Sequence, residues 1–256
     1  MLEIFKELRK FSNVIFHEKD HHYFIDGKEA ISSTTIIKKY EKPFDSEYWS
    51  ARKAPELGMT PEEVAAMWED QGTRASFKGT KVHSYIENAL ANKILPFEEQ
   101  AGVMMENCGE IISAYDKIIL MVDEFLNDIK DKMLPIRSEV IIGDSEHLIA
   151  GMVDQIFYNL KSKKLELWDW KTNKKIDEKT QYKLLKPLSH LSNSKLDIYS
   201  LQLSLYKYII EKNTNLKLGN SYICWFNEKN STYKIFKCEN YEKYIKLMIN
   251  DYCSRK

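Results

Sequence analysis

The segment that most constrains the fold is LELWDWKTNK, residues 165–174, which has the pattern of an apolar strand with charged side chains at its end. Successive side chains of a strand point to opposite faces of its sheet. One face would therefore carry Leu165, Leu167, Asp169 and Lys171. The other would carry Glu166, Trp168 and Trp170. Charges at a buried sheet edge cost free energy unless they are compensated. The pattern thus indicates a buried strand whose end has a function, although the D-x-K tripeptide alone also fits a solvated ion pair.

A second carboxylate, Asp154, ends another apolar run, and it precedes Asp169 by 15 residues. Neighbouring strands would bring these two acids and Lys171 together. Carboxylates are the ligands that Mg²⁺ and Mn²⁺ prefer, and a nearby ammonium can orient the attacking water and meet the charge that develops on a phosphate. The three residues therefore favour metal-dependent hydrolysis of a phosphodiester.

The charge balance excludes a general positive coat for nucleic acid. Lys and Arg together number 38, as do Asp and Glu, so the formal net charge is zero. Any binding of nucleic acid must then come from a local basic surface. The four cysteines, at positions 108, 224, 238 and 253, form no CxxC pair, so neither zinc nor thioredoxin-type chemistry is indicated.

Neither a membrane span nor export is expected. No stretch reaches about 18 consecutive apolar residues, and the N-terminal MLEIFKELRKF lacks the apolar core of a signal peptide. We expect reduced thiols and a cytoplasmic protein, of a bacterium or of a phage-infected host cell.

Hydrophobic periodicity and turn signals predict a mixed order of elements. Helices are expected over residues 1–12, 81–92, 111–130 (ended by Pro135), 196–212 and 241–252. Strands are expected over residues 22–25 and 30–31 around the turn dipeptide Asp26-Gly27, and over 138–142, 147–158, 164–170, 221–226 and 233–237. Residues 34–78 read as a polar helical lobe, with a capping box at Thr60-Pro61-Glu62-Glu63. Short connections predict antiparallel pairing of the strands that carry Glu139, Asp154 and Asp169.

Further side chains accompany the two acids and the lysine, and each also has an ordinary structural explanation. His83 and Glu87 share a helical face, where a histidine often merely packs, but imidazole is a good ligand for Mn²⁺. Glu139 begins a strand and could be an exposed acid. Gln202 and Tyr206 lie at i and i+4 on a helix, either as plain surface or to contact a phosphate or brace Lys171.

Polar and basic residues follow Lys171 directly. A phosphate backbone could lie along this segment, whose side chains include Thr172, Lys174 and Lys175.

In this order the motifs resemble the PD-(D/E)XK nuclease superfamily, and more narrowly its RecB-like branch, which includes mitochondrial genome-maintenance exonucleases and many phage exonucleases. The resemblance covers about residues 79–210, and the N-terminal hairpin and lobe also look similar to that exonuclease subgroup. It rests on GTKVH (His83), SEVII (Glu139), AGMVD (Asp154), DWKTNK (Asp169, Lys171) and QLSLY (Gln202, Tyr206).

The resemblance implies an α/β fold of restriction-endonuclease type: a central mixed sheet flanked by helices, with an N-terminal hairpin and helical lobe. We expect residues 1–78 to gate DNA ends and residues 79–256 to form the nuclease core.

The resemblance also implies roles for individual residues. His83, Asp154, Asp169 and the backbone carbonyl of Trp170 would bind Mg²⁺ or Mn²⁺, and Glu139 would support a second metal or its waters. Lys171 would be catalytic together with the carboxylates. Gln202 and Tyr206 would position Lys171 and the DNA.

An iron–sulfur cluster is not expected. Some relatives, including CRISPR-adaptation exonucleases, bind one through one early and three late cysteines. Here the three late cysteines are separated by 13 and 14 residues, too far apart for the tight triplet of those relatives.

The expected activity is a metal-dependent DNA exonuclease that acts on single strands or exposed ends in replication, recombination or repair, with DNA and proteins of those processes as its expected partners. Three alternatives stay open: a structure-specific endonuclease, a nuclease subunit of a CRISPR or recombination complex, and a catalytically silent DNA-binding protein.

The lobe is expected to hold single-stranded DNA, because basic groups can follow phosphates while aromatic rings stack on bases. The alternative is a solvated helical face whose aromatic side chains pack inward. The residues concerned are Lys38, Lys39, Lys42, Arg52, Lys53, Arg74 and Lys78 with Tyr40, Phe44, Tyr48, Trp49 and Phe77.

Overall fold

The computed structural model describes residues 2–91 and 109–255. The helices are α1 (Leu2–Leu8), α2 (Ser33–Lys38), α3 (Ser46–Leu57), α4 (Pro61–Leu90), α6 (Gly109–Ile129), α7 (Lys195–Asn213) and α8 (Glu242–Ser254), with a 3₁₀ turn at Arg9–Phe11. The strands are β1 (Val14–His17), β2 (His22–Ile25), β3 (Lys28–Ser32), β4 (Met133–Asp144), β5 (Ile149–Asn159), β6 (Lys164–Lys171), β7 (Leu218–Trp225) and β8 (Lys234–Cys238).

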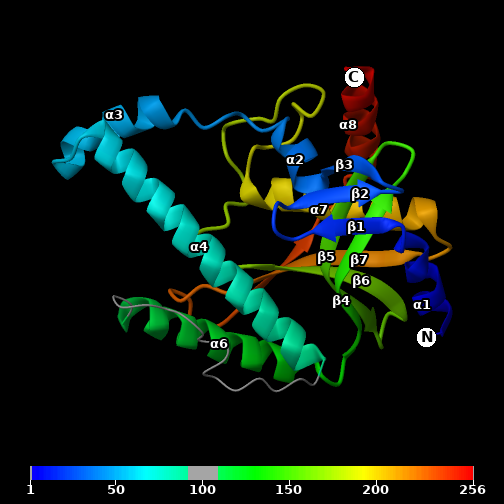
Figure 1. Ribbon diagram of the computed structural model, residues 1–256. Helices are drawn as coiled ribbons and strands as arrows, with labels where there is room; N and C mark the ends of the chain where they lie inside the picture. The colour runs from blue at the N-terminus through cyan, green and yellow to red at the C-terminus, as the bar shows by residue number, and fades with distance from the viewer. Residues whose placement is uncertain (1, 92–108, 256) are drawn as a thin grey trace.

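The strands form one mixed sheet flanked by helices, which confirms the α/β prediction (Figure 1). Its order is β1-β2-β3-β5-β6-β7-β8, and β4 pairs with β5. The β3–β5 and β6–β7 pairs are parallel, and the others are antiparallel. The predicted antiparallel pairing of the three strands that carry the acids is therefore confirmed. The predicted hairpin is also present, with Asp26 and Gly27 at φ 49° and 77° between β2 and β3.

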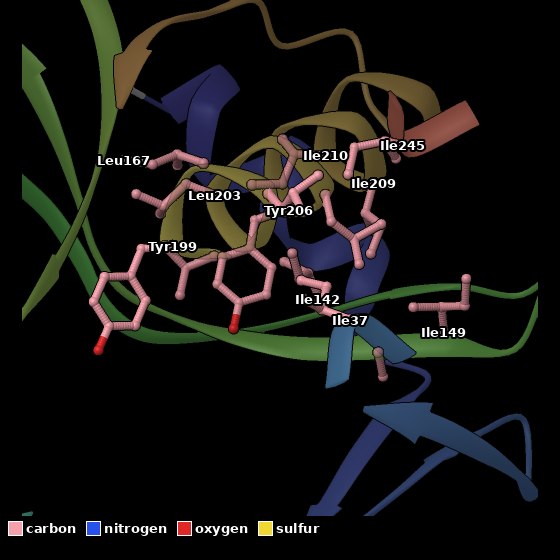
Figure 2. Packing of buried hydrophobic residues seen from close by; sticks show 14 of the residues in the cluster. Ile37, Ile142, Ile149, Leu167, Tyr199, Leu203, Tyr206, Ile209, Ile210 and Ile245 are labelled. Carbon is pink, nitrogen blue, oxygen red and sulfur yellow. The ribbon is translucent and has the colours of Figure 1, made fainter. Parts of the chain in front are cut away.

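Each face of the sheet has its own hydrophobic core, and β6 contributes to both. Leu165 and Leu167 belong to the cluster that contains α7, α8 and α2, part of which Figure 2 shows. Trp168 and Trp170 belong to the other cluster, with α6 and the end of α4. This alternation confirms the two faces predicted from the sequence.

The largest correction concerns α4. The helix that was expected to begin at residue 81 is the C-terminal part of one continuous helix, Pro61–Leu90, which starts with the predicted capping box. The boundary proposed between residues 78 and 79 thus falls inside α4. Gly79 costs a helix about 1 kcal/mol relative to Ala, but Val82 and Ile86 just beyond it are fully buried and hold the helix against the core.

One smaller expectation was wrong, and one strand was not predicted at all. Pro135 does not end a helix: α6 ends at Ile129, and Pro135 lies in β4, beside a register irregularity. The strand β1, Val14–His17, was not predicted because it is too short to show clear alternation; it pairs with β2 and closes the N-terminal sheet edge.

The helical lobe projects from the body of the molecule. In Figure 1, α3 and the N-terminal half of α4 extend away from the sheet. Along α4, residues 69–77 are all exposed, as are Phe44, Tyr48 and Trp49. Tyr40 is an exception to the expected surface, because it is 2% exposed and donates hydrogen bonds to Asp251 and to the carbonyl of Met248.

Across the described residues, no helix is both long and apolar enough to cross a membrane. Cys224 and Cys238 are buried thiols and Cys253 is exposed, whereas Cys108 lies outside the described residues.

Candidate metal centre

The candidate site lies where β5 and β6 part. Their backbone ladder ends at the Gln155–Trp168 pair. Beyond that point the carboxylate of Asp154 replaces a backbone acceptor: its Oδ2 accepts a hydrogen bond of 2.8 Å from the Trp170 amide. The other end of β5 pairs with β3 at Ile149 and Ala150. Asp154 therefore lies on the stretch of β5 between the residues that pair with β3 and the residues that pair with β6.

Glu139 faces Asp154 from β4. It lies between the paired positions Ser138–Gln155 and Val140–Val153, so the register puts it opposite Asp154. Its backbone adopts φ 47°, in the left-handed region that non-glycine residues rarely occupy. Such strain concentrates at functional sites, where the surroundings hold it in place.

His83 comes from α4 and completes a group of three. Its Nε2 donates to the carbonyl oxygen of Trp170 at 3.0 Å, which fixes the ring. Its Nδ1 then faces the two acids, 3.5 Å from Asp154 Oδ2 and 4.0 Å from Glu139 Oε1. Donor atoms of these three side chains all lie within 4.8 Å of one another, close enough to share one metal ion.

Asp169 and Lys171 form a buried ion pair next to this group. Asp169 is 1% exposed; its Oδ2 contacts the Lys171 ammonium and its Oδ1 accepts a 3.4 Å hydrogen bond from Gln202. The Lys171 ammonium also lies 4.8 Å from the centre of the Tyr199 ring. Asp169 is thus braced from α7, and it is not among the three residues whose donor atoms cluster.

Gln202 and Tyr206 were expected to brace Lys171, and their contacts differ from that expectation. Gln202 contacts Asp169 rather than Lys171, and it donates to the Tyr206 hydroxyl at 2.9 Å. Tyr206 itself is 3% exposed, so it lies behind Gln202. Tyr199, which lies beside Lys171, was missed; its position one helical turn before Gln202 was the available signal. Figure 2 shows the rings of Tyr199 and Tyr206 extending from α7 in the same direction.

Burial and crowding of negative charge raise the pKa of two acids. Desolvation, with repulsion from Asp154, Glu87 and Asp169, raises the pKa of Glu139 to about 8. Desolvation raises the pKa of Asp169 to about 6, although the Lys171 ammonium opposes the shift. Crowded carboxylates of this kind are stabilised by a cation. One imidazole, these carboxylates and a nearby carbonyl are donors that could hold a metal ion.

The raised pKa of Glu139 predicts how the stability of the metal-free protein depends on pH. Between its unfolded pKa of about 4.5 and its folded pKa of about 8, the folded chain holds a proton that the unfolded chain has lost. Stability should therefore fall as pH rises through this window. Thermal melts in chelator should show a lower Tm at pH 8 than at pH 6, and Glu139→Gln should reduce that difference. Mn²⁺ should raise Tm more at pH 8, because the metal competes with the proton. An equal fall of Tm between pH 6 and pH 8 in Glu139→Gln would show that Glu139 is not the titrating group.

Gly151 makes room for Tyr206 over β5. A Cβ at this position would lie 2.5 Å from a Tyr206 ring carbon and 2.6 Å from Ser33 Oγ. Gly151→Ala should therefore displace Tyr206 and cost about 1–3 kcal/mol of stability. Gly72→Ala is the matched control, because it lies on exposed α4 with no atom near its would-be Cβ, and it should stabilise slightly. Denaturant unfolding would compare them; equal stabilities for the two variants would contradict the tight packing.

The expected DNA-binding residues lie at the end of β6. Thr172 is half-buried and lies beside Gly79 of α4: a Cβ added at Gly79 would be 3.6 Å from the Thr172 hydroxyl oxygen. Lys174 and Lys175 are exposed, and Lys174 donates to Gln71 of α4 at 3.0 Å. The end of β6 is thus joined to α4, the helix that carries His83.

A second group with metal-ligand chemistry lies in the turn between β4 and β5: Asp144, Glu146 and His147. The Lys212 ammonium contacts both acids, at 2.8 Å from Asp144 and 2.6 Å from Glu146. A cation of the protein itself therefore already meets this negative charge.

Comparisons with known proteins leave the family of this chain open. No family model matches it, and no curated protein matches it. Among solved structures 19 chains match. One of them, the crystal structure of SSO0001, aligns over 100% of this chain and 85% of its own, with 14% identity and a TM-score of 0.33. A TM-score of this size is too low to assign a shared fold.

Proposed function

We propose that this protein is a Mg²⁺- or Mn²⁺-dependent deoxyribonuclease of the restriction-endonuclease-like, RecB-like type. The observation that carries the proposal is the meeting of Asp154, Asp169 and Lys171 with Glu139 and His83 where β5 and β6 part. Metal-dependent phosphodiester hydrolysis needs acidic metal ligands and a cation beside the reacting phosphate. We place the protein in the cytoplasm, with DNA as its partner.

Each side chain has a separate task in this reaction. Asp154, Glu139 and His83 would hold the ion, with Asp169 and the Trp170 carbonyl adjacent to it. A bound divalent ion supplies polarisation of the scissile phosphate and a lower pKa for a coordinated water. Lys171, fixed by Asp169 and Tyr199, orients the nucleophile and stabilises the negative charge of the transition state. Gln202 fixes the orientation of Asp169.

The experiment that tests the function is digestion of linear DNA labelled at its 5′ or 3′ end, with Mg²⁺, Mn²⁺ or chelator. The proposal expects cleavage only when metal is present. Release of single labelled nucleotides from one end would assign an exonuclease and its polarity, whereas internal fragments would assign an endonuclease. No metal-dependent cleavage of any DNA would leave a silent DNA-binding protein or a subunit that needs its complex.

An exonucleolytic mode is favoured by the projecting lobe. Its exposed aromatic and basic side chains suit a single strand that passes α3 and α4 on its way to His83. Some of the basic groups have acidic partners, among them Lys53 with Glu56, Arg74 with Asp70 and Lys78 with Glu228. Lys38, Lys39 and Lys42 are exposed at the base of the lobe, where phosphates could be bound.

A lobe that admits a strand by its end predicts a strong preference for linear DNA. Linear single-stranded DNA should be degraded, and a circle of the same sequence should be spared. The measurement is gel analysis of both substrates in one reaction. The circle is then opened by a single nick and tested again. Nicking should make the circle a substrate. Cutting of the intact circle as fast as the linear form would contradict entry by the end and favour an endonuclease.

A further inference from the structure

A separate pocket lies between the lobe and the segment that precedes α7. Its volume is about 380 Å³. Its lining residues include Lys42, Phe44, Trp49, Tyr182, Asn193 and Lys195. Two backbone hydrogen bonds hold its wall in place: Leu185 N donates to the Tyr40 carbonyl at 2.8 Å, and Asn193 N donates to the Tyr182 carbonyl at 2.9 Å. Because Tyr40 is part of the core, the pocket is anchored to the body of the protein.

Three aromatic side chains of the pocket are exposed to solvent. Phe44 is 66% exposed, Trp49 is 40% exposed and Tyr182 is 46% exposed. Exposed aromatic rings around a hollow are sites for a flat apolar ligand, because each ring offers a face on which that ligand can stack. The rings therefore point to a planar group rather than to a chain of aliphatic carbons.

The charges around the pocket favour an anionic ligand. Lys42 and Lys195 line it, and the Lys42 ammonium lies 5.1 Å from the centre of the Tyr182 ring. Arg52 lies 5.8 Å from the centre of the Trp49 ring. Glu41 is the one acid among the lining residues given for the pocket. Planar rings with cations beside them are the features that bind a base together with its phosphates.

The pocket is connected to the candidate metal centre through α7. Lys195 and Ile198 line the pocket from the first turn of α7, and Tyr199, the next residue, lies against Lys171. Gln202 follows Lys195 by seven residues, about 10 Å along a helix.

We propose that this pocket binds one nucleobase of a single-stranded nucleic acid, stacked against Tyr182 and Trp49, while Lys42 and Lys195 meet the neighbouring phosphates. This subsite rests on the proposed function, since it holds the strand beside the centre that would cleave it.

The test measures binding separately from cleavage. Fluorescence anisotropy with a labelled single-stranded oligonucleotide in chelator gives the Kd without hydrolysis. Tyr182→Leu and Trp49→Leu should each raise the Kd by about tenfold, whereas Tyr182→Phe and Trp49→Phe, which keep a ring, should stay within about twofold. Lys42→Gln should weaken binding and reduce its salt dependence. Leu120→Ala, at an exposed position on α6, is the control and should change nothing.

The outcomes separate the subsite from the nuclease function. Unchanged binding by the leucine variants, or a wild type that does not bind single strands, would overturn the subsite. If the leucine variants lose binding but the wild type cleaves no DNA with Mg²⁺ or Mn²⁺, the subsite stands and the proposed hydrolysis fails. If the wild type cleaves DNA and the leucine variants bind as well as it does, the hydrolysis stands and the subsite fails.

Discussion

Replacing Lys171 with Ala should reduce cleavage by orders of magnitude while single-stranded DNA still binds. The Lys171 ammonium is the cation fixed beside the carboxylates, held by Asp169 and the Tyr199 ring. Loss of one preorganised group that stabilises transition-state charge costs about 10²–10³ in turnover. Single-turnover cleavage would measure the loss. Lys179→Ala, an exposed lysine of the following segment, is the control and should retain wild-type turnover.

The same substitution leaves Asp169 buried without its ammonium, which would raise the pKa of that acid further. Raising the pH separates the two effects. If Lys171 acts in the transition state, high pH will not restore the activity of the Lys171→Ala variant. Recovery of activity at high pH would mean that the lysine only kept Asp169 ionised. Turnover within about tenfold of wild type, a difference of about 1.4 kcal/mol, would exclude a catalytic role.

Asp154→Asn and Asp169→Asn should each remove activity, but they should differ in stability. In Asp154→Asn the amide oxygen can still accept from the Trp170 amide, so the fold is kept while an anionic ligand is lost. In Asp169→Asn the largely buried Lys171 ammonium loses its partner, and breaking a buried pair costs about 3–5 kcal/mol. Cleavage assays and denaturant unfolding of both variants would measure these effects.

Glu146→Gln is the matched control for these two variants, since Glu146 is an exposed acid of the second group, beside Lys212. It should retain full activity. His83→Ala should give a graded loss that is worse in Mg²⁺ than in Mn²⁺, because imidazole is the better ligand for Mn²⁺. Full activity of Asp154→Asn would remove the metal-ligand role of the carboxylate, and equal stabilities of the two Asn variants would contradict the buried ion pair.

The strands of the site could be predicted from the sequence because alternation is a local property. The apolar run before Asp169 gave both faces of β6 correctly, and short connections gave the antiparallel pairing of β4, β5 and β6. The parting of β5 and β6 is not local: it depends on β3 pairing with the start of β5. The hydrogen bond from the Trp170 amide to Asp154 was therefore not predictable.

Long-range packing decided the other differences. A glycine at position 79 suggested a helix boundary, but the burial of Val82 and Ile86 keeps α4 continuous. Tyr40 was grouped with the exposed aromatics of the lobe, yet contacts with α8 bury it. Tyr199 had no motif of its own, and its spacing from Gln202 became meaningful only with its distance to Lys171.

We propose above that His83, Glu139 and Asp154 hold a divalent ion, with Asp169 adjacent to it. The most direct measurement is anomalous diffraction from crystals of the protein grown with Mn²⁺. We predict a strong anomalous peak within the ligand distance of a hard divalent cation, about 2.0–2.6 Å, of the Asp154 carboxylate, and its absence from crystals of Asp154→Asn. A peak only between Asp144, Glu146 and His147, or none at saturating Mn²⁺, would contradict the claim.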